Sequence, residues 1–197
     1  MSKAERTKQF IIEKTAPVFN KKGYYATSLT DITNVTGLTK GSIYGNFKDK
    51  DEVALAAYTY NYNRLWTAIK SIINGQTGAL EKLLSITNFY RTNWNKLSEL
   101  GGCPLMNAAT EVDDSLEFMR PKVRQTFKSW KQVFVGLLDE GIEQKIFKSN
   151  ISSDEYATIL VAMLEGGILL SKISGKNKDI LMVLDRIEQI INEEIKL

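Results

Sequence analysis

Two groups of side chains in this 197-residue sequence have the types that catalysis needs, and neither has a histidine partner. Cys103 is the only cysteine, and a thiolate at the start of a helix is stabilised and nucleophilic. Glu111, Asp113, Asp114 and Glu117 form the second group, since paired carboxylates can transfer protons or bind a divalent cation. Because histidine is absent, Ser-His-Asp and Cys-His pairs and most zinc and iron sites are excluded. We expect a buried thiol, solvated acids, no metal and no cofactor, with an enzyme built on either group as the alternative.

A third group is suited to contacts with nucleic acid. Within residues 39–47 the apolar Ile43 and Phe47 are four positions apart and can face inward. The other side chains carry hydroxyl, amide and ammonium donors, which contact base edges and phosphates in a DNA groove. A glycine inside a helix costs about 1 kcal/mol relative to alanine, and a close approach to DNA would explain two of them here. A loosely helical connector is the alternative. The residues expected to face a duplex are Thr39, Lys40, Gly41, Ser42, Tyr44 and Asn46.

Charge is concentrated near the start of the chain. Residues 1–50 hold nine Lys and Arg against four Asp and Glu, whereas the remainder holds 17 against 19. This imbalance indicates an anion-binding module, with nucleic acid as the expected polyanion. Lys50 lies in the first turn of a predicted helix, where a cation is unfavourable unless an anion such as phosphate binds there. Thr27 and Ser28 are also placed to contact a DNA backbone, with helix capping as the alternative.

The elements that position these residues are all predicted to be helical. Apolar residues recur at intervals of three and four almost everywhere, which predicts an all-α fold. A capping box at 28–31 and a glycine at position 37 predict a short helix, a tight turn and a further short helix over 40–47. A helix over 49–73 would be about 38 Å long. The other helices are expected at 4–22, 79–97, 104–111, 121–140, 153–174 and 179–196.

This order predicts two domains: a three-helix helix-turn-helix DNA-binding domain over 1–50 and a helical bundle for effector binding and dimerisation over 51–197. A cytoplasmic location is expected, because the first residues lack an apolar signal region and a single cysteine forms no intrachain disulfide. The longest apolar run, 159–164, is shorter than the roughly 18 to 20 residues that span a bilayer, so no membrane helix is expected.

Three stretches resemble the N-terminal signature of the tetracycline-repressor (TetR) family. They are Ser-Leu-Thr-Asp-Ile at 28–32, Val-Thr-Gly-Leu-Thr-Lys-Gly-Ser-Ile-Tyr at 35–44 and Phe-Lys-Asp-Lys-Asp-Glu-Val at 47–53. The chain departs from the family at Thr33 and Thr36, where alanine is usual, and at Gly45-Asn46, where a bulkier pair is common. The second departure concerns which bases are read. Residues 101–111 also resemble a Gly-Cys-x-x-x-Asn-Ala-x-x-Glu segment found in one subset of such regulators.

The resemblance implies a homodimeric transcriptional regulator, usually a repressor, that binds a palindromic DNA operator and is released by a small-molecule effector. Aromatic and flexible apolar residues in the second domain indicate an apolar or aromatic effector, with ordinary core packing as the alternative. A helical scaffold or ligand carrier that does not read DNA sequence is the rival function. The predicted effector pocket comprises Phe89, Trp94, Cys103, Met106, Asn107, Phe127, Trp130, Phe134 and Met163.

The last two predicted helices each have a face of apolar and small residues. Paired with the same faces of a second chain, they would form a four-helix bundle, although packing within one chain accounts for part of each face. A two-fold dimer would also place two reading helices about 34 to 36 Å apart, or a multiple of that, along DNA. The predicted dimer interface comprises Ile159, Met163, Gly166, Gly167, Leu170, Leu184, Ile187 and Ile191.

Overall fold

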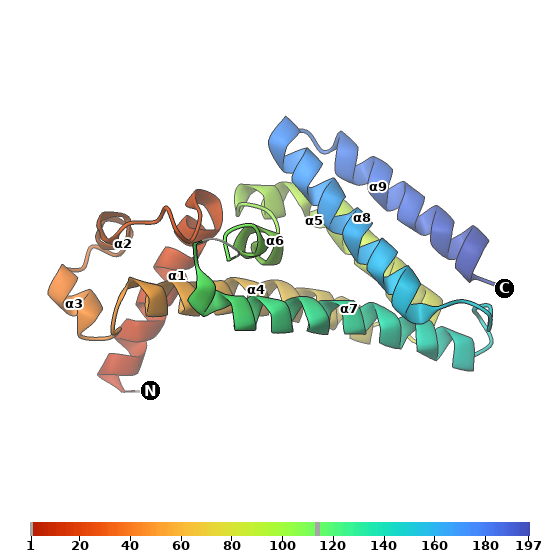
Figure 1. Ribbon diagram of the computed structural model, residues 1–197, viewed down its shortest axis with the longest axis horizontal. Helices are drawn as coiled ribbons and strands as arrows, with labels where there is room; N and C mark the ends of the chain where they lie inside the picture. Colours follow the sequence, from red (N-terminus) through yellow and green to blue (C-terminus); the bar gives the residue numbers. More distant parts are fainter. Residues whose placement is uncertain (1, 113–114) are drawn as a thin grey trace. The chain divides into compact units, whose positions relative to one another are not determined.

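Helices account for nearly all of the regular structure in the computed structural model, which describes residues 2–112 and 115–197 (Figure 1). The all-α prediction is therefore confirmed. Within these ranges the one β-type pairing is an isolated bridge between Phe147 and Lys196. The elements are α1 (Lys3–Lys22), α2 (Leu29–Thr36), α3 (Lys40–Tyr44), α4 (Lys50–Asn74), α5 (Ala79–Glu99), α6 (Pro104–Ala109), η1 (Glu117–Met119), α7 (Arg120–Glu143), α8 (Ser153–Ser174), α9 (Lys178–Gln189) and η2 (Ile190–Ile195).

The chain forms two compact units, each of which combines two segments of sequence. Unit 1 consists of Met1–Leu65 and Leu100–Arg124, and unit 2 consists of Trp66–Glu99 and Gln125–Leu197. Two of the three boundaries fall inside α4 and α7, so both of these helices contribute residues to each unit. The domain division at residue 50 stays a prediction.

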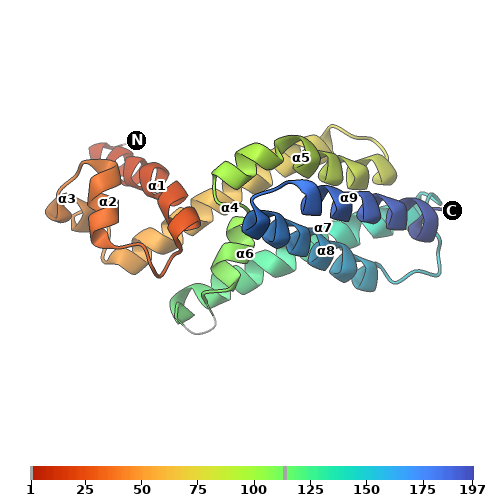
Figure 2. The same cartoon turned by 90° about the horizontal axis from the view of Figure 1, so that it is seen from above.

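The core of unit 1 lies between α1, α2 and the first turns of α4. Phe19 and Tyr24 stack with ring centroids 5.8 Å apart, and Tyr24 meets Tyr58 edge-on at 5.9 Å. Aromatic pairs of this geometry add to the free energy gained by burying their area. Ile11 and Ile32 complete the centre of the unit and are fully buried. Helices α1 and α2 and the start of α4 therefore share one core, and Figure 2 shows these helices from above.

Unit 2 is organised around the pair α8 and α9, which lie side by side (Figures 1 and 2). A Cβ at Gly167 would lie 3.0 Å from side-chain atoms of Ile180 and Val183, so glycine allows these two helices to approach closely. By length and composition α8 is apolar enough to cross a membrane, which the contiguous apolar run did not predict. Its Leu160 and Leu164 are buried within unit 2, as in a core helix.

Several predicted helix ends differ from the structure by two residues or more, and at two of them the local conformation changes. The helix expected over 179–196 is regular only to Gln189 and continues as the π-helical turn η2. The wider turn closes with a hydrogen bond from Lys196 N to Ile191 O at 2.9 Å, and the chain end is fixed by Leu197 N donating to Ile146 O at 3.0 Å. The third helix was expected to reach residue 47 but ends at Tyr44, because Gly45 begins a turn.

Candidate nucleic-acid interface

The α2–turn–α3 segment is built from capping groups that the sequence supplies. Ser28 accepts a hydrogen bond from Asp31 N at 3.2 Å, and Asp31 in return accepts one from Ser28 N at 2.7 Å, which completes the predicted capping box. Gly37 ends α2 in the left-handed conformation, with φ of +70°. Thr39 then caps α3 by accepting from Ser42 N at 3.2 Å. The two short helices therefore begin and end as the capping pattern predicts.

Thr36, where the family usually has alanine, contributes to this turn. Its hydroxyl is buried and donates to Ile32 O at 2.7 Å, while its Oγ1 accepts from Leu38 N at 3.3 Å. Because the hydroxyl joins the last turn of α2 to the residue after Gly37, this departure from the family adds a hydrogen bond to the turn. It leaves the module itself unchanged.

The residues of 39–47 divide into an inner and an outer face. Ile43 and Phe47 are buried, as predicted, and anchor the segment in the core of unit 1. Tyr44 is 46% exposed. Ser42 and Asn46 are half-buried, and Asn46 Nδ2 donates to Ser42 O at 2.9 Å. Of the residues predicted to face a duplex, the exposed ones are Thr39, Lys40, Gly41 and Tyr44.

The three candidates outside residues 39–47 meet at the turn between α1 and α2. Thr27 is buried and donates to Gly23 O at 2.6 Å, so its side chain holds the turn. Ser28 is exposed and pairs with Asp31, whose pKa is lowered by hydrogen bonds from Lys22 and from Ser28. The carboxylate of Asp31 is therefore stabilised in its charged form at the start of α2.

Lys50 reaches this turn from the start of α4. Its ammonium group donates to Tyr25 O at 3.0 Å and to Thr27 O at 3.1 Å. The cation in the first turn of α4 is therefore fixed by two carbonyl oxygens of the turn, a contact that the sequence did not suggest. Its charge remains close to the start of α2, where a phosphate was expected.

Glu111 is a residue of this region whose role was missed. Its Oε1 accepts from Tyr24 N at 3.0 Å, and its Oε2 accepts from Tyr25 N at 2.8 Å. The expectation that Glu111 is a solvated acid is therefore wrong, because two backbone amides bind it. A Cβ at Gly23 would lie 3.2 Å from Glu111 Oε1, and this glycine has φ of +102°, so space and conformation both favour glycine there.

The other acids of that group are Asp113, Asp114 and Glu117. Asp113 and Asp114 lie outside the described residues. The side chain of Glu117 is 82% exposed and lies 4.0 Å from Arg120. Within residues 2–112 and 115–197, no group of three or more His, Cys, Asp or Glu side chains is placed to hold a metal ion.

Asn107 forms a second link between the α6 segment and α1. Its side-chain amide donates to Asn20 O at 3.1 Å, to Asn20 Oδ1 at 3.0 Å and to Gly101 O at 2.8 Å. Asn20 Nδ2 donates back to Leu100 O at 2.7 Å. We call the hydrogen bonds that Asn107 and Glu111 make with residues 20–25 the α6 clamp. It attaches the segment around α6 to the end of α1 and the following turn by polar contacts that range from buried at Asn107 to exposed at Tyr25.

Comparison with known proteins identifies the family that shares this architecture. Residues 79–187, more than half of the chain, match the family model described as the tetracyclin repressor-like C-terminal domain. Residues 11–57 match the model of bacterial regulatory proteins of the tetR family. The chain belongs to the TetR family. Since members of this family are DNA-binding transcriptional regulators and not enzymes, this protein is a TetR-family transcriptional regulator, and the scaffold and enzyme alternatives are not favoured.

Individual relatives resemble this TetR-family protein over 84% to 100% of its length. The crystal structure of a TetR-family regulator from Cytophaga hutchinsonii is 38% identical, with a TM-score of 0.94, and the match covers 100% of this chain and 98% of that one. The HTH-type transcriptional regulator YxaF of Bacillus subtilis is 24% identical over 95% of this chain and 96% of its own. The HTH-type transcriptional repressor DhaR of a Mycobacterium species is 25% identical over 84% and 82%.

The predicted effector residues of this TetR-family chain lie in both units. Cys103, Met106 and Asn107 belong to unit 1 and are buried there, with Asn107 bonded in the α6 clamp. The others belong to unit 2, where Trp130 meets Trp66 edge-on at 6.1 Å and Phe134 at 5.1 Å. The unit 2 members are Phe89, Trp94, Trp130 and Phe134, which are buried, and Phe127 and Met163, which are half-buried.

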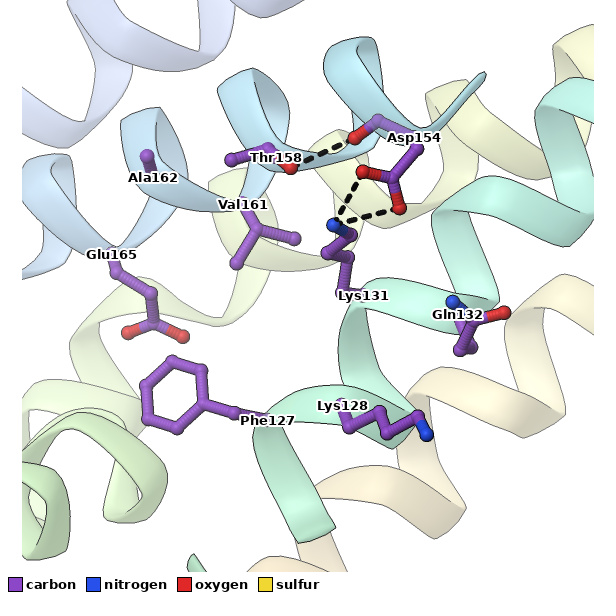
Figure 3. A pocket seen from close by; sticks show the side chains of 9 residues that line it. All are labelled: Phe127, Lys128, Lys131, Gln132, Asp154, Thr158, Val161, Ala162 and Glu165. Atoms are coloured by element: carbon purple, nitrogen blue, oxygen red, sulfur yellow. Dashed lines mark hydrogen bonds and ion pairs between the residues drawn. The ribbon is translucent and has the colours of Figure 1, made fainter. Parts of the chain in front are cut away.

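A pocket of about 580 Å³ opens between α7 and α8 in unit 2, and Figure 3 shows its lining. Of the predicted effector residues, Phe127 is the one that lines it. Glu165, which the sequence did not single out, lies on its wall and is only 8% exposed. The sequence signal that could have indicated Glu165 is an acidic residue among the apolar residues of a predicted helix. The lining residues are Phe127, Lys128, Lys131, Gln132, Asp154, Thr158, Val161, Ala162 and Glu165.

The predicted dimer residues differ in exposure. Ile159 and Leu170 are 39% and 55% exposed, and Met163 and Gly166 are half-buried. Gly167, Leu184, Ile187 and Ile191 are buried, because the packing within unit 2 already covers them. Apolar side chains that the sequence did not single out are exposed on the same two helices, namely Leu169, Ile173 and Met182.

Proposed function

We propose that this TetR-family regulator is a repressor that binds a palindromic operator as a homodimer and leaves it when a small-molecule effector binds. The observation that carries the proposal is that the outer face of α3 is exposed while its inner face is anchored in the core. Thr39 caps the helix, Ile43 is fixed in the core, and the side chain of Lys40 points to solvent. A short, rigidly seated helix with exposed donors is the form in which a helix-turn-helix reads the major groove.

Gly41 supports a close approach of DNA to α3. A Cβ at this position would find its nearest neighbour, Thr39 Oγ1, 3.9 Å away, so packing within the protein does not require glycine. Glycine nevertheless costs about 1 kcal/mol relative to alanine in a helix. We infer that the space is needed by the duplex. Gly45 is different, because a Cβ there would lie 3.2 Å from Gly41 O within the same turn.

The second copy of the chain is proposed to pack on the exposed faces of α8 and α9. Leu170 and Ile173 are 55% and 76% exposed, and Met182 of α9 is 58% exposed. Soluble monomers seldom leave such a set of large apolar side chains in water on adjoining helices. The proposed interface keeps Ile159, Met163, Gly166 and Leu170 from the sequence prediction and adds Leu169, Ile173 and Met182.

The effector is proposed to have a substantial apolar or aromatic part and to act through α4. The pocket in unit 2 is walled largely by carbon, with Phe127, Val161 and Ala162 among its lining residues. Because α4 runs without interruption from Lys50 to Asn74, it belongs to both units and can transmit a change in unit 2 to the reading helices. A tilt of α4 in each protomer would alter the spacing of the two α3 helices and so weaken operator binding.

Selection of bound duplexes from a random pool tests whether the protein prefers a palindromic operator. A palindromic consensus with two half-sites is expected, and Lys40→Ala or Ser42→Ala should change the preferred bases. Lys50→Ala should lower affinity for every duplex and reduce the slope of affinity against salt by about one. Lys176→Ala removes the same charge from an exposed position in unit 2 and should change neither property. Enrichment of no sequence would overturn the proposal.

A further inference from the structure

The turn between α1 and α2 is held from two sides by groups of opposite charge. On one side, the Glu111 carboxylate accepts hydrogen bonds from Tyr24 N at 3.0 Å and from Tyr25 N at 2.8 Å. On the other side, the Lys50 ammonium group donates to Tyr25 O at 3.0 Å and to Thr27 O at 3.1 Å. The backbone of Tyr25 therefore contacts both charges, the carboxylate through its N–H and the ammonium group through its carbonyl oxygen.

The peptide groups of the turn connect the two charged side chains. Hydrogen bonds to a charged group are about twice as strong as neutral ones, and bonds in a chain polarise one another. Gly23 O closes the turn by accepting from Thr27 N at 3.2 Å and from Thr27 Oγ1 at 2.6 Å. Residues 23–27 therefore form one hydrogen-bonded unit between Glu111 and Lys50. If the amide of Tyr25 is released by Glu111, the carbonyl oxygen that holds Lys50 loses its fixed position as well.

Lys50 keeps one donor for a ligand while the turn holds it. An ammonium group has three N–H donors, and the carbonyl oxygens of Tyr25 and Thr27 take two of them. Lys50 Nζ also lies 5.8 Å from the ring centroid of Tyr25, a side chain that is 64% exposed. A flexible lysine loses side-chain freedom when it binds a phosphate, whereas this ammonium group is already ordered in the free protein. Its fixed position therefore favours binding.

We propose that Glu111 is a positioning residue for operator binding, which fixes the ammonium group of Lys50 through the backbone of Tyr25. The proposal rests on the proposed function, in which Lys50 contacts a DNA phosphate. A carboxylate near a DNA-binding surface repels phosphates, so removal of its charge alone would strengthen binding. Positioning has the opposite consequence, because Glu111→Gln loosens the turn and with it Lys50. The sign of the change in operator affinity therefore distinguishes the two effects.

A double-mutant cycle tests the link. Operator affinity is measured for the full-length protein, for Glu111→Gln, for Lys50→Ala and for the double variant. Glu111→Gln should weaken binding about threefold in the unmodified background, toward the low end of coupling between connected groups, and should have no further effect when residue 50 is alanine. It should also reduce the slope of affinity against salt by part of the one unit that Lys50→Ala removes. Tighter binding by Glu111→Gln, or an equal loss in both backgrounds, would overturn the inference.

Three controls separate positioning from charge and from stability. Glu117→Gln removes a carboxylate that is 82% exposed and should not weaken binding. Ile86→Val lowers stability in the core of unit 2 and should leave affinity unchanged at temperatures where every variant is folded. A cycle of Glu111→Gln with Lys40→Ala should be additive, since Lys40 belongs to α3 and not to the turn. A loss in Ile86→Val equal to that in Glu111→Gln, or coupling to Lys40 as strong as to Lys50, would contradict the inference.

A duplex of unrelated sequence separates this inference from the proposed function. A phosphate contact carries no sequence information, so the Glu111–Lys50 coupling should appear on this duplex as well as on the operator. Coupling on both duplexes supports both proposals. Coupling without any sequence preference supports the role of Glu111 and contradicts a specific operator. A preferred palindrome that Lys50→Ala binds more weakly, with no coupling to Glu111, supports the proposed function and contradicts the inference.

Discussion

Replacing Glu111 by glutamine tests whether the α6 clamp holds the turn that precedes the reading helices. The carboxylate accepts hydrogen bonds from Tyr24 N and Tyr25 N, one with each oxygen. Glutamine has one acceptor oxygen, and its NH2 group would face the second backbone N–H donor to donor. One charge-assisted hydrogen bond is therefore lost, and the other becomes a neutral one. Since the side chain is half-buried and water can replace part of the interaction, we expect a loss of about 1 to 3 kcal/mol in unfolding free energy.

Thermal unfolding and operator affinity measure this change. For a chain of this size 1 kcal/mol corresponds to about 2 to 4 °C in Tm, so Glu111→Gln should lower Tm by roughly 2 to 12 °C. Operator binding should weaken as well, because the turn held by Glu111 leads directly into α2. Glu117→Gln removes a neighbouring carboxylate that is 82% exposed and should change stability by less than about 0.5 kcal/mol. If the two variants unfold at the same temperature, the clamp does not contribute to stability and our interpretation of Glu111 is refuted.

Three further predictions concern the reading helices and the dimer. Acid titration should destabilise the start of α2 as pH falls below about 4. The folded-state pKa of Asp31 is lowered by its hydrogen bond from Lys22, and this stabilisation exists only while the carboxylate is charged. The Asp31→Asn variant should lack this component in the pH dependence of its unfolding free energy. Gly41→Ala should raise unfolding free energy by up to about 1 kcal/mol and lower operator affinity at least about tenfold, and a variant that binds as tightly as the original would show that DNA does not approach this position. Leu170→Glu combined with Ile173→Glu should yield monomers in sedimentation experiments with loss of operator binding, whereas a stable dimer would place the interface elsewhere.

The reading helices were predictable because their signals are local. Ser28, Thr39 and Gly37 act on backbone groups within three or four residues of themselves, so capping and turn preferences operate at short range. The inward orientation of Ile43 and Phe47 follows in the same way from helical periodicity. These positions also carry the resemblance to the TetR family, which is why the fold class and the family could be anticipated from the sequence.

The contacts that were missed join residues far apart in the chain. Glu111 and Tyr24 are separated by 87 positions, and so are Asn107 and Asn20. A carboxylate followed by further acids has the pattern of an exposed segment, and no local preference indicates that two distant amides will bind it. Glu165 was missed for a related reason, since the α7 residues that share its pocket are recognised only when the two helices are packed.

The composition of unit 1 has a practical consequence for protein engineering. The stretch that matches the N-terminal family model ends at residue 57, but the compact unit that contains it also requires Leu100–Arg124. A hybrid repressor made by joining residues 1–57 to the effector-binding domain of another regulator would leave Asn20 and the amides of Tyr24 and Tyr25 without the partners that Leu100–Arg124 supplies. A biosensor that is to keep the DNA-binding part of this protein should therefore contain Leu100–Arg124 together with the first three helices.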